Sequence, residues 1–297
     1  SRGLGDVYKR QGMGGLDLAV RTVFPDADVA WHVEIDPAAC ALLEYRYPGV
    51  PNLGDITQLD MSALDGVDVL TAGYPCQPFS TAGRREGVED ERHLWPVVFD
   101  AIRTLRPQFT FIENVRGHLA VGFNEVLRDC ASAGLDVRWA VVRAADVGAP
   151  HHRPRLFAVI ADSFEFGLEA RESRGELAAS FARVTRGGRP LSCDRFGWGE
   201  SLRGRRRSVV ADQFGRYADA ILRWEETMGC APVPVLSGAH GERVMNVELP
   251  EWLMGLPRGF VSGVPGLSRK DILKILGNGV CPLQGAFALE QLFGVEY

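Results

Sequence analysis

Strand-like and helix-like segments alternate through the first half of the chain, and this alternation is the feature that most constrains the fold. Short apolar runs, typical of buried strands, are separated by stretches with apolar residues at helical spacing. The predicted strands are residues 28–35, 67–72, 109–112, 137–142 and 156–160, and the predicted helices are residues 37–47, 94–105, 119–133 and 283–293. This order predicts an α/β fold with a mostly parallel sheet covered by helices on both faces.

The alternation stops near residue 162 and order returns near residue 247. The intervening segment is rich in Gly, Arg and Ser and has no clear period, which predicts a less regular module. Residues 161–224 carry 12 Arg and 9 Asp or Glu, a local net charge of +3 (12 − 9), whereas the whole chain has −5. A basic segment in an acidic chain is typical of a surface that faces a polyanion, and a solvated loop is the alternative.

Composition narrows the class of protein. Apolar residues make up 46% and charged residues 24% of the 297 residues, as in ordinary globular proteins. There is no run of about 18 apolar residues and no signal-peptide pattern at the start, so we expect a cytoplasmic protein that does not enter a membrane. The six cysteines show neither CxxC pairs nor zinc-ligand spacing, so we expect a reducing compartment and no metal.

The first candidate motif is the glycine-rich turn Gly12-Met13-Gly14-Gly15, which precedes a helical run. Glu34 follows Gly15 by 19 residues, at the end of a predicted strand. Glycines before a helix and an acid about 20 residues later are typical of nucleotide binding, because the backbone approaches the ligand and the acid holds ribose hydroxyls. An ordinary turn is the alternative.

The second candidate is Cys76, which lies between Pro75 and Pro78 just after an apolar run. A cysteine attacks as the thiolate, which requires an exposed and electropositive setting. The prolines stiffen this loop, and Arg84 and Arg85 follow closely. The pattern indicates a nucleophile, and a structural cysteine in a proline-rich turn is the alternative.

The third candidate is Glu113-Asn114-Val115, directly after a predicted strand. The carboxyl ends of parallel strands form the ligand-binding edge of such sheets. A partly buried glutamate there has a raised pKa and can act as a general acid, and a simple capping turn is the alternative.

The fourth candidate is the run from His151 to Arg155, just before another predicted strand. If it is extended, Arg153 and Arg155 point to one face and can grip a phosphate or a carbonyl oxygen. The adjacent His151 and His152 are more typical of a surface than of a metal site.

Taken together and in this order, the motifs resemble those of the cytosine-C5 DNA methyltransferases over nearly the whole chain. The matching segments are GMGG (12–15), GDI (54–56), PCQPFS (75–80), ENV (113–115), HRPR (152–155) and GNGV (277–280). The resemblance implies a Rossmann-like S-adenosylmethionine-dependent methyltransferase fold. It also implies a catalytic domain made of residues 12–162 plus 247–297, and a smaller irregular target-recognition domain at residues 163–246.

The resemblance implies the roles of individual residues. Cys76 would attack carbon 6 of a flipped cytosine, and Glu113 would hydrogen-bond its N3 and amine. The implied catalytic residues are Cys76, Glu113, Asn114, Arg153 and Arg155. The implied S-adenosylmethionine-binding residues are Gly12, Gly14, Gly15, Glu34, Asp55, Ile56, Pro75, Leu94 and Asn278. The implied partners are double-stranded DNA and a cognate restriction endonuclease, and a monomer is expected.

Two departures from the family pattern stand out. Residues 1–11 are polar and charged where the family has an apolar strand, so we expect a non-native or truncated start in which that strand is missing. Gly279 lies where many relatives carry Ser.

Three other functions stay open. They are an RNA methyltransferase that modifies cytosine C5 in transfer RNA, a catalytically impaired DNA-binding relative, and a Cys-His hydrolase that uses Cys76 with His151 or His152.

Overall fold

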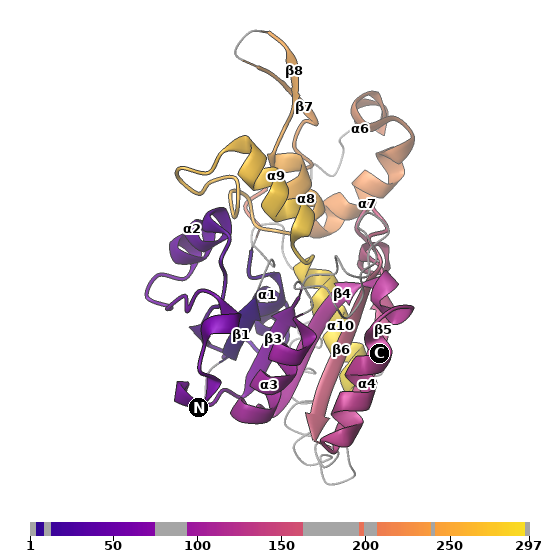
Figure 1. Cartoon of the computed structure of the whole chain (residues 1–297). Coiled ribbons are helices and arrows are strands. Elements are labelled where there is room, and N and C mark those ends of the chain that lie inside the picture. Colours follow the sequence, from indigo (N-terminus) through magenta and orange to yellow (C-terminus); the bar gives the residue numbers. More distant parts are fainter. Residues whose placement is uncertain are drawn as a thin grey trace.

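The structure, a computed structural model, describes residues 4–8, 13–74, 94–162, 196–198, 207–238 and 241–294. A sheet flanked by helices forms the larger part, and a smaller, mainly helical part lies beyond one end of it (Figure 1). The strands are β1 (Leu4–Tyr8), β2 (Val29–Trp31), β3 (Val69–Gly73), β4 (Phe109–Val115), β5 (Leu135–Val142), β6 (Arg155–Asp162), β7 (Val235–Ser237) and β8 (Arg243–Met245). The α-helices are α1 (Gly15–Val23), α2 (Pro37–Arg46), α3 (Trp95–Leu105), α4 (Phe123–Ser132), α6 (Arg207–Phe214), α7 (Ala218–Met228), α8 (Glu248–Leu253), α9 (Arg269–Asn278) and α10 (Pro282–Phe293). Short 3-10 helices are η1 (Ile56–Gln58), η2 (Met61–Ala63), η5 (Arg116–Leu119), η6 (Ala144–Val147) and η8 (Gly215–Tyr217).

The main sheet has the strand order β2-β1-β3-β4-β6-β5. The pairs β1–β2, β1–β3 and β3–β4 are parallel, whereas β6 is antiparallel to both of its neighbours. The prediction of a mostly parallel α/β sheet is therefore confirmed. β6 can run in reverse because residues 143–154, which connect it to β5, contain only η6 and form no crossover helix.

The direction of β6 matters for the site. Since β6 is antiparallel to β4, its first residue lies at the carboxyl end of β4, with Arg155 opposite Val115. The HRPR segment is thereby brought beside the ENV segment, about 40 residues earlier in the chain.

The expectation that the sheet lacks a strand before the glycine-rich turn is wrong. The backbone of β1 lies between β2 and β3 and pairs in parallel with both, with Leu4 opposite Val69 and Tyr8 opposite Gly73. The strand itself has the sequence LGDVY, in which Leu4, Val7 and Tyr8 are apolar, and backbone hydrogen bonds to neighbours on both sides satisfy its polar main chain, so the charged residues nearby do not prevent a strand here.

Each face of the sheet is covered by a separate apolar cluster. On one face α3 and α4 pack through Trp95, Val98 and Val126 against β3, β4 and β6, including Ile112. On the other face α1 and α10 pack against Phe111, Phe157 and Val159. Neighbouring residues 111 and 112 point to opposite faces, as the period of two in a strand requires. Figure 1 shows α3 and α4 in front of the sheet and α10 behind it.

Part of the stretch that we predicted to be less regular forms two regular helices, α6 and α7, and much of the rest of that stretch lies outside the described residues. Helix α7 buries Ile221, Trp224 and Met228 along one face. Trp224 packs edge-on against Trp252 of α8, and its indole nitrogen donates to the Trp252 carbonyl at 3.0 Å. The domain boundary near residue 246 stays a prediction, and α8, which follows it, packs on α7.

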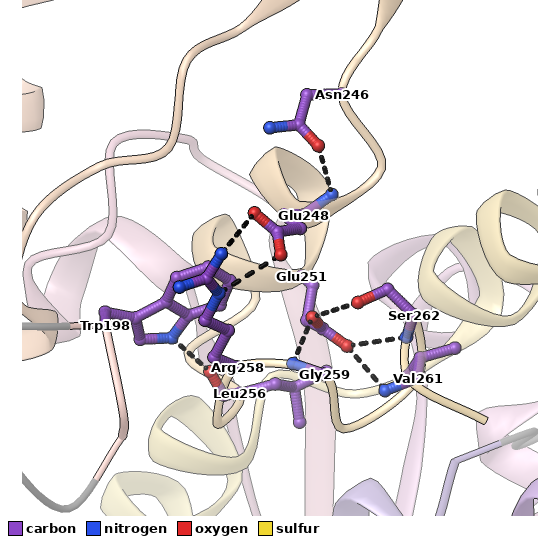
Figure 2. A network of polar contacts seen from close by, with 9 residues as sticks. All are labelled: Trp198, Asn246, Glu248, Glu251, Leu256, Arg258, Gly259, Val261 and Ser262. Atoms are coloured by element: carbon purple, nitrogen blue, oxygen red, sulfur yellow. Dashed lines mark hydrogen bonds and ion pairs between the residues drawn. The ribbon is translucent and has the colours of Figure 1, made fainter.

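A buried carboxylate organises the turn after α8. Glu251 is fully buried and accepts hydrogen bonds from the backbone N–H groups of Gly259, Val261 and Ser262 and from the Ser262 hydroxyl (Figure 2). Four donors satisfy both carboxylate oxygens, so Glu251 has a structural role. Nearby, the Trp198 indole donates to the Leu256 carbonyl at 2.8 Å.

One described stretch, Arg269–Phe293, is long and apolar enough to cross a membrane, and its most apolar 18-residue window has a mean hydropathy of 1.3. It comprises two helices, α9 and α10, and 67% of its most apolar window is buried inside the fold. Core helices pass the same test, so the finding is weak evidence for a membrane segment.

Candidate active site

A buried ion pair lies at the carboxyl end of β4. The Nε atom of Arg155 is 2.9 Å from Oε1 of Glu113, and both side chains are largely buried. Antiparallel pairing places Arg155 opposite Val115, two residues along from Glu113, so the two side chains emerge on the same face of the sheet. The structure therefore brings together two residues that the sequence placed in different motifs.

Burial dominates the electrostatics of Glu113. Removal from water raises the pKa of this carboxyl, while the positive charges of Arg155 and Arg153 lower it by less. The predicted upward shift in pKa is confirmed. A carboxyl with a raised pKa and a guanidinium against one oxygen can donate a proton or a hydrogen bond through the other oxygen.

Asn114 links β4 to the segment that leads to the cysteine. Its amide nitrogen donates to the carbonyl of Tyr74 at 3.4 Å, and its own side-chain oxygen accepts from the Val115 backbone at 2.8 Å. Tyr74 directly precedes Pro75 and Cys76 in the chain. Asn114 is thus positioned to hold the start of that loop, and β4 extends through this motif instead of ending before it.

Arg153 does not point into an open site. Its guanidinium donates to the carbonyls of Gly277 and Gly279 at 2.8 and 2.6 Å, which joins the HRPR segment to the GNGV segment. Burial, and then the charge of Arg155, lower the pKa of Arg153 to about 10. Its φ of 36° is left-handed, so this arginine is not in the extended conformation that the sequence analysis considered.

Gln284, which the sequence analysis missed, supports this unusual backbone. It is fully buried on α10, and its amide nitrogen donates to the carbonyls of Arg153 and Val142 at 2.9 and 2.8 Å. The sequence signal was a single amide side chain within the apolar run CPLQGAFAL. A polar residue in such a run indicates a specific buried partner.

The two histidines of this segment differ. The Nε2 atom of His151 lies 2.9 Å from the carbonyl of Leu253 and donates to it, whereas His152 is exposed. Burial lowers the pKa of His151. Among the residues that the structure describes, no group of three or more His, Cys, Asp or Glu could hold a metal ion.

The two glycine-rich segments pack against each other. A Cβ atom on Gly15 would lie 2.6 Å from the carbonyl oxygen of Val280, so only glycine permits this approach. Gly14 has a φ of 64° and precedes the first turn of α1, whose backbone N–H groups have no partner within the helix. The N-terminus of α1 thus lies beside the GNGV segment, a favourable place for a carboxylate.

Gly279, where the sequence analysis noted a departure, lies against a different residue, Met13. A Cβ atom there would lie 2.5 Å from Cε and 2.9 Å from Cγ of Met13, which is fully buried. Met13 fills the space that a serine side chain would need.

The remaining cofactor candidates lie on several elements: Glu34 follows β2, Asp55 and Ile56 begin η1, Leu94 precedes α3, and Asn278 ends α9. Glu34 lies three residues after β2, and its Oε1 accepts from the backbone of Ile35 and Asp36, both at 2.8 Å. Asp55 caps η1 through Thr57 at 3.0 Å.

The other candidates differ in exposure. Ile56 and Leu94 are buried in the cluster under α3, whereas Asn278 is exposed at the end of α9. Gly12, Pro75 and Cys76 lie outside the described residues, as do Arg84 and Arg85.

Comparison with known proteins gives the same family as the motifs. Residues 10–178 match the family described as C-5 cytosine-specific DNA methylase. The chain is 36% identical to the Type II methyltransferase M.NlaX of Neisseria lactamica over 155 residues, which are 50% of this chain and 49% of that protein. It is also 36% identical to M.NgoMIV of Neisseria gonorrhoeae over 132 residues, 43% of this chain and 42% of that protein. The matches therefore span about half the length of these curated relatives.

Among solved structures, the Dnmt2 methyltransferase of S. pombe has a TM-score of 0.60 at 15% identity, covering 97% of this chain and 98% of that one. This likeness supports the methyltransferase fold over the whole chain. With more than half of the sequence matched by the family, the chain belongs to the C-5 cytosine-specific DNA methylases.

Proposed function

We propose that this chain transfers a methyl group from S-adenosylmethionine to carbon 5 of cytosine in a specific duplex DNA sequence. The observation that carries the proposal is the buried Glu113–Arg155 pair at 2.9 Å, next to the contact of Asn114 with Tyr74. This pair provides a carboxyl with a raised pKa immediately beside the chain segment that leads to Cys76.

The residues present fit the proposed cofactor. The close approach of Gly15 to Val280, which any Cβ would block, sets the GNGV segment beside the N-terminus of α1, whose first backbone N–H groups have no partner within the helix and suit the cofactor carboxylate. The carboxylate of Glu34, fixed by two backbone N–H groups, suits ribose hydroxyls, and Asp55 suits the adenine side. When bound, S-adenosylmethionine supplies an electrophilic methyl group.

In the proposed reaction, the Cys76 thiolate adds to carbon 6 of a cytosine that has been flipped out of the duplex. The π electrons of the 5,6 double bond would shift through carbon 4 onto N3, which takes the proton of Glu113, so that carbon 5 becomes enamine-like. Carbon 5 would then form its bond to the methyl group as the methyl–sulfur bond of S-adenosylmethionine breaks, and S-adenosylhomocysteine would leave with that electron pair. Loss of the proton from carbon 5 to a base restores the double bond and expels the Cys76 thiolate. Atoms and charge balance without a further reagent.

Glu113 would stabilise the ring during this addition. In its protonated form the carboxyl donates to N3, while its second oxygen accepts from the exocyclic amine. Arg155, already paired with Glu113, would contact the cytosine carbonyl oxygen, and its charge would favour the electron-rich ring. Arg153 would keep the GNGV segment in register with these residues.

The smaller part of the protein and the basic segment near it would provide contacts to DNA, in keeping with the net charge of +3 over residues 161–224. We further propose that the protein works as a cytoplasmic monomer with a companion restriction endonuclease. Support comes from relatives named Type II methyltransferases.

Incubation with tritiated S-adenosylmethionine and either a long unmethylated PCR duplex or unmodified transfer RNA tests the proposal. We expect label in the duplex, at positions that bisulfite sequencing identifies as 5-methylcytosine, and none after Cys76→Ser. Label in transfer RNA alone would establish the RNA alternative. Binding of duplex without any transfer, by a chain that does not bind S-adenosylmethionine, would establish the impaired relative.

A further inference from the structure

Tyr74 occupies a key position in the chain. It is the last described residue before Pro75 and Cys76, and it follows directly on β3, where Gly73 is opposite Glu113. Its carbonyl accepts from Asn114, and its ring is buried between Trp95 and His118, with centroid distances of 6.0 and 5.5 Å. Whatever fixes Tyr74 therefore fixes the point from which the chain continues to Cys76.

The Tyr74 hydroxyl is hydrogen-bonded to His118. The second contact of the His118 ring determines which of the two groups donates. The Tyr74 hydroxyl lies 2.8 Å from Nε2 of His118, and Nδ1 of His118 lies 3.1 Å from the carbonyl of Val121. A carbonyl only accepts, so Nδ1 carries the ring proton. In the neutral imidazole Nε2 is then an acceptor, and the Tyr74 hydroxyl donates to it.

The surroundings keep the phenol protonated and able to donate. Burial raises the pKa of Tyr74 well above its usual range, and the nearby Cys130, Glu125 and Glu113 raise it further. These three groups lie on α4 and β4, on two sides of the tyrosine.

We propose that His118 is a positioning residue for methyl transfer, because its hydrogen bond fixes Tyr74, the residue from which the chain continues to Cys76, relative to Glu113. The inference rests on the proposed function. Tyr74 is held twice, at its carbonyl by Asn114 and at its hydroxyl by His118, and both holders follow from the same β4–η5 segment. Glu113, Asn114 and His118 thus form one unit that aligns the carboxyl with the start of the cysteine loop.

A purely structural role would not need these groups. His118 is fully buried, and an apolar side chain there, with phenylalanine in place of Tyr74, would pack against Phe123 without any buried side-chain polar atom to satisfy. The bond matters for the reaction because an error of about 1 Å in the position of a reacting group costs on the order of a hundredfold in rate.

The test compares Tyr74→Phe, His118→Leu, His118→Gln and the double variant Tyr74→Phe/His118→Leu in the full chain. Tyr45→Phe, at a tyrosine that is 51% exposed, is the matched control. The measurements are the single-turnover rate of methyl transfer to a PCR duplex, the Kd values for S-adenosylmethionine and duplex, and the thermal midpoint, with all rates taken below the lowest midpoint.

We expect Tyr74→Phe and His118→Leu each to lower the single-turnover rate about tenfold, with both Kd values within about twofold of wild type. The double variant is no slower than either single one, because both remove the same bond. His118→Gln, which keeps an acceptor for the hydroxyl, retains more activity than His118→Leu, and this difference disappears in the Tyr74→Phe background. Tyr45→Phe leaves the rate unchanged.

Two results would overturn the inference. In the first, Tyr74→Phe and His118→Leu lower the thermal midpoint but leave the single-turnover rate at the wild-type value. The bond would then stabilise the fold and have no part in methyl transfer. The other is independent, multiplicative losses in the double variant. In both cases the wild-type chain still methylates DNA and the proposed function stands, whereas a wild-type chain that transfers no methyl group would overturn the proposed function and this inference together.

Discussion

Glu113 is held between two opposing influences on its pKa. Burial raises the pKa, and the positive charges of Arg155 and Arg153 lower it. The substitution Arg155→Gln removes one of these charges, so the pKa of Glu113 rises further. If protonated Glu113 binds N3, the rate falls as pH increases through this pKa, and in the variant this fall occurs at higher pH than in the wild type.

The pH dependence of the single-turnover rate measures this shift, alongside an overall loss of roughly a hundredfold in Arg155→Gln. Arg143→Gln is the control, because Arg143 pairs with Asp146 near the surface and does not affect Glu113. If the rate of Arg155→Gln falls at the same pH as that of the wild type, or at a lower pH, Glu113 does not act in its protonated form.

A second prediction at the scale of single residues concerns Gly15. A Cβ atom there would lie 2.6 Å from the backbone oxygen of Val280, which cannot rotate away as a side chain can. We expect Gly15→Ala to lower the free energy of unfolding by about 1–3 kcal/mol and to weaken binding of S-adenosylmethionine. Gly277→Ala is the matched control, since nothing lies within 4 Å of the added Cβ on this helical residue.

Urea unfolding and calorimetry with S-adenosylmethionine measure the two effects. The control should be neutral or slightly stabilising, because alanine favours a helix over glycine by about 1 kcal/mol. If Gly15→Ala and Gly277→Ala have the same free energy of unfolding and the same affinity for S-adenosylmethionine, the two glycine-rich segments do not approach closely in solution.

At the scale of elements, the helices and strands of the first half were predictable because each one has its apolar residues at a clear period. Helix α2 and strand β4 begin at the predicted residues. The sequence analysis missed α7, although Ile221, Trp224 and Met228 have helical spacing, because the surrounding arginine- and glycine-rich stretch obscured the period. Strand β1 was missed because its partners, and not its own polarity, determine its pairing.

The burial and raised pKa of Glu113 were predictable from its residue type and its place after a strand. Contacts between distant segments were not. The Arg153 guanidinium on the GNGV carbonyls, and the bond between Tyr74 and His118, depend on how the chain brings separate segments together. No local period encodes such pairs.

The prediction at the scale of elements concerns Gln284. This side chain on α10 is hydrogen-bonded to the last residue of β5 and to a residue just before β6. Its amide nitrogen donates to the carbonyls of Val142 and Arg153 at 2.8 and 2.9 Å, and buried carbonyls require hydrogen-bond partners. We expect Gln284→Leu to reduce the free energy of unfolding by about 1–3 kcal/mol for each carbonyl left unsatisfied. The matched control is Gln291→Leu, the same change at an exposed position of the same helix.

Urea unfolding of both variants gives the comparison, and the slope of the transition shows whether the unfolded states match. A loss no larger in Gln284→Leu than in Gln291→Leu would argue that water satisfies the two carbonyls instead.

At the scale of the whole molecule, the sheet would bind the cofactor and the smaller part would meet DNA. The hairpin β7–β8 extends away from the rest of the protein, and its register sets Ser237 opposite Arg243 and Val235 opposite Met245 (Figure 1). All four residues are exposed. A two-stranded ribbon fits the major groove of DNA, where an exposed arginine can reach a phosphate at the groove edge.

The last prediction follows from this arrangement. Arg243→Ala should weaken duplex binding across sequences and lower the salt dependence of the association constant by about one unit of slope, because one phosphate contact is lost. The Kd for S-adenosylmethionine should stay the same, since the hairpin is remote from α1 and β2 (Figure 1). Arg128→Ala is the control, with a side chain that is 72% exposed on α4, on the far part of the molecule. If both variants bind duplex equally well, the hairpin does not contact the phosphates, and the basic segment must bind DNA through other residues.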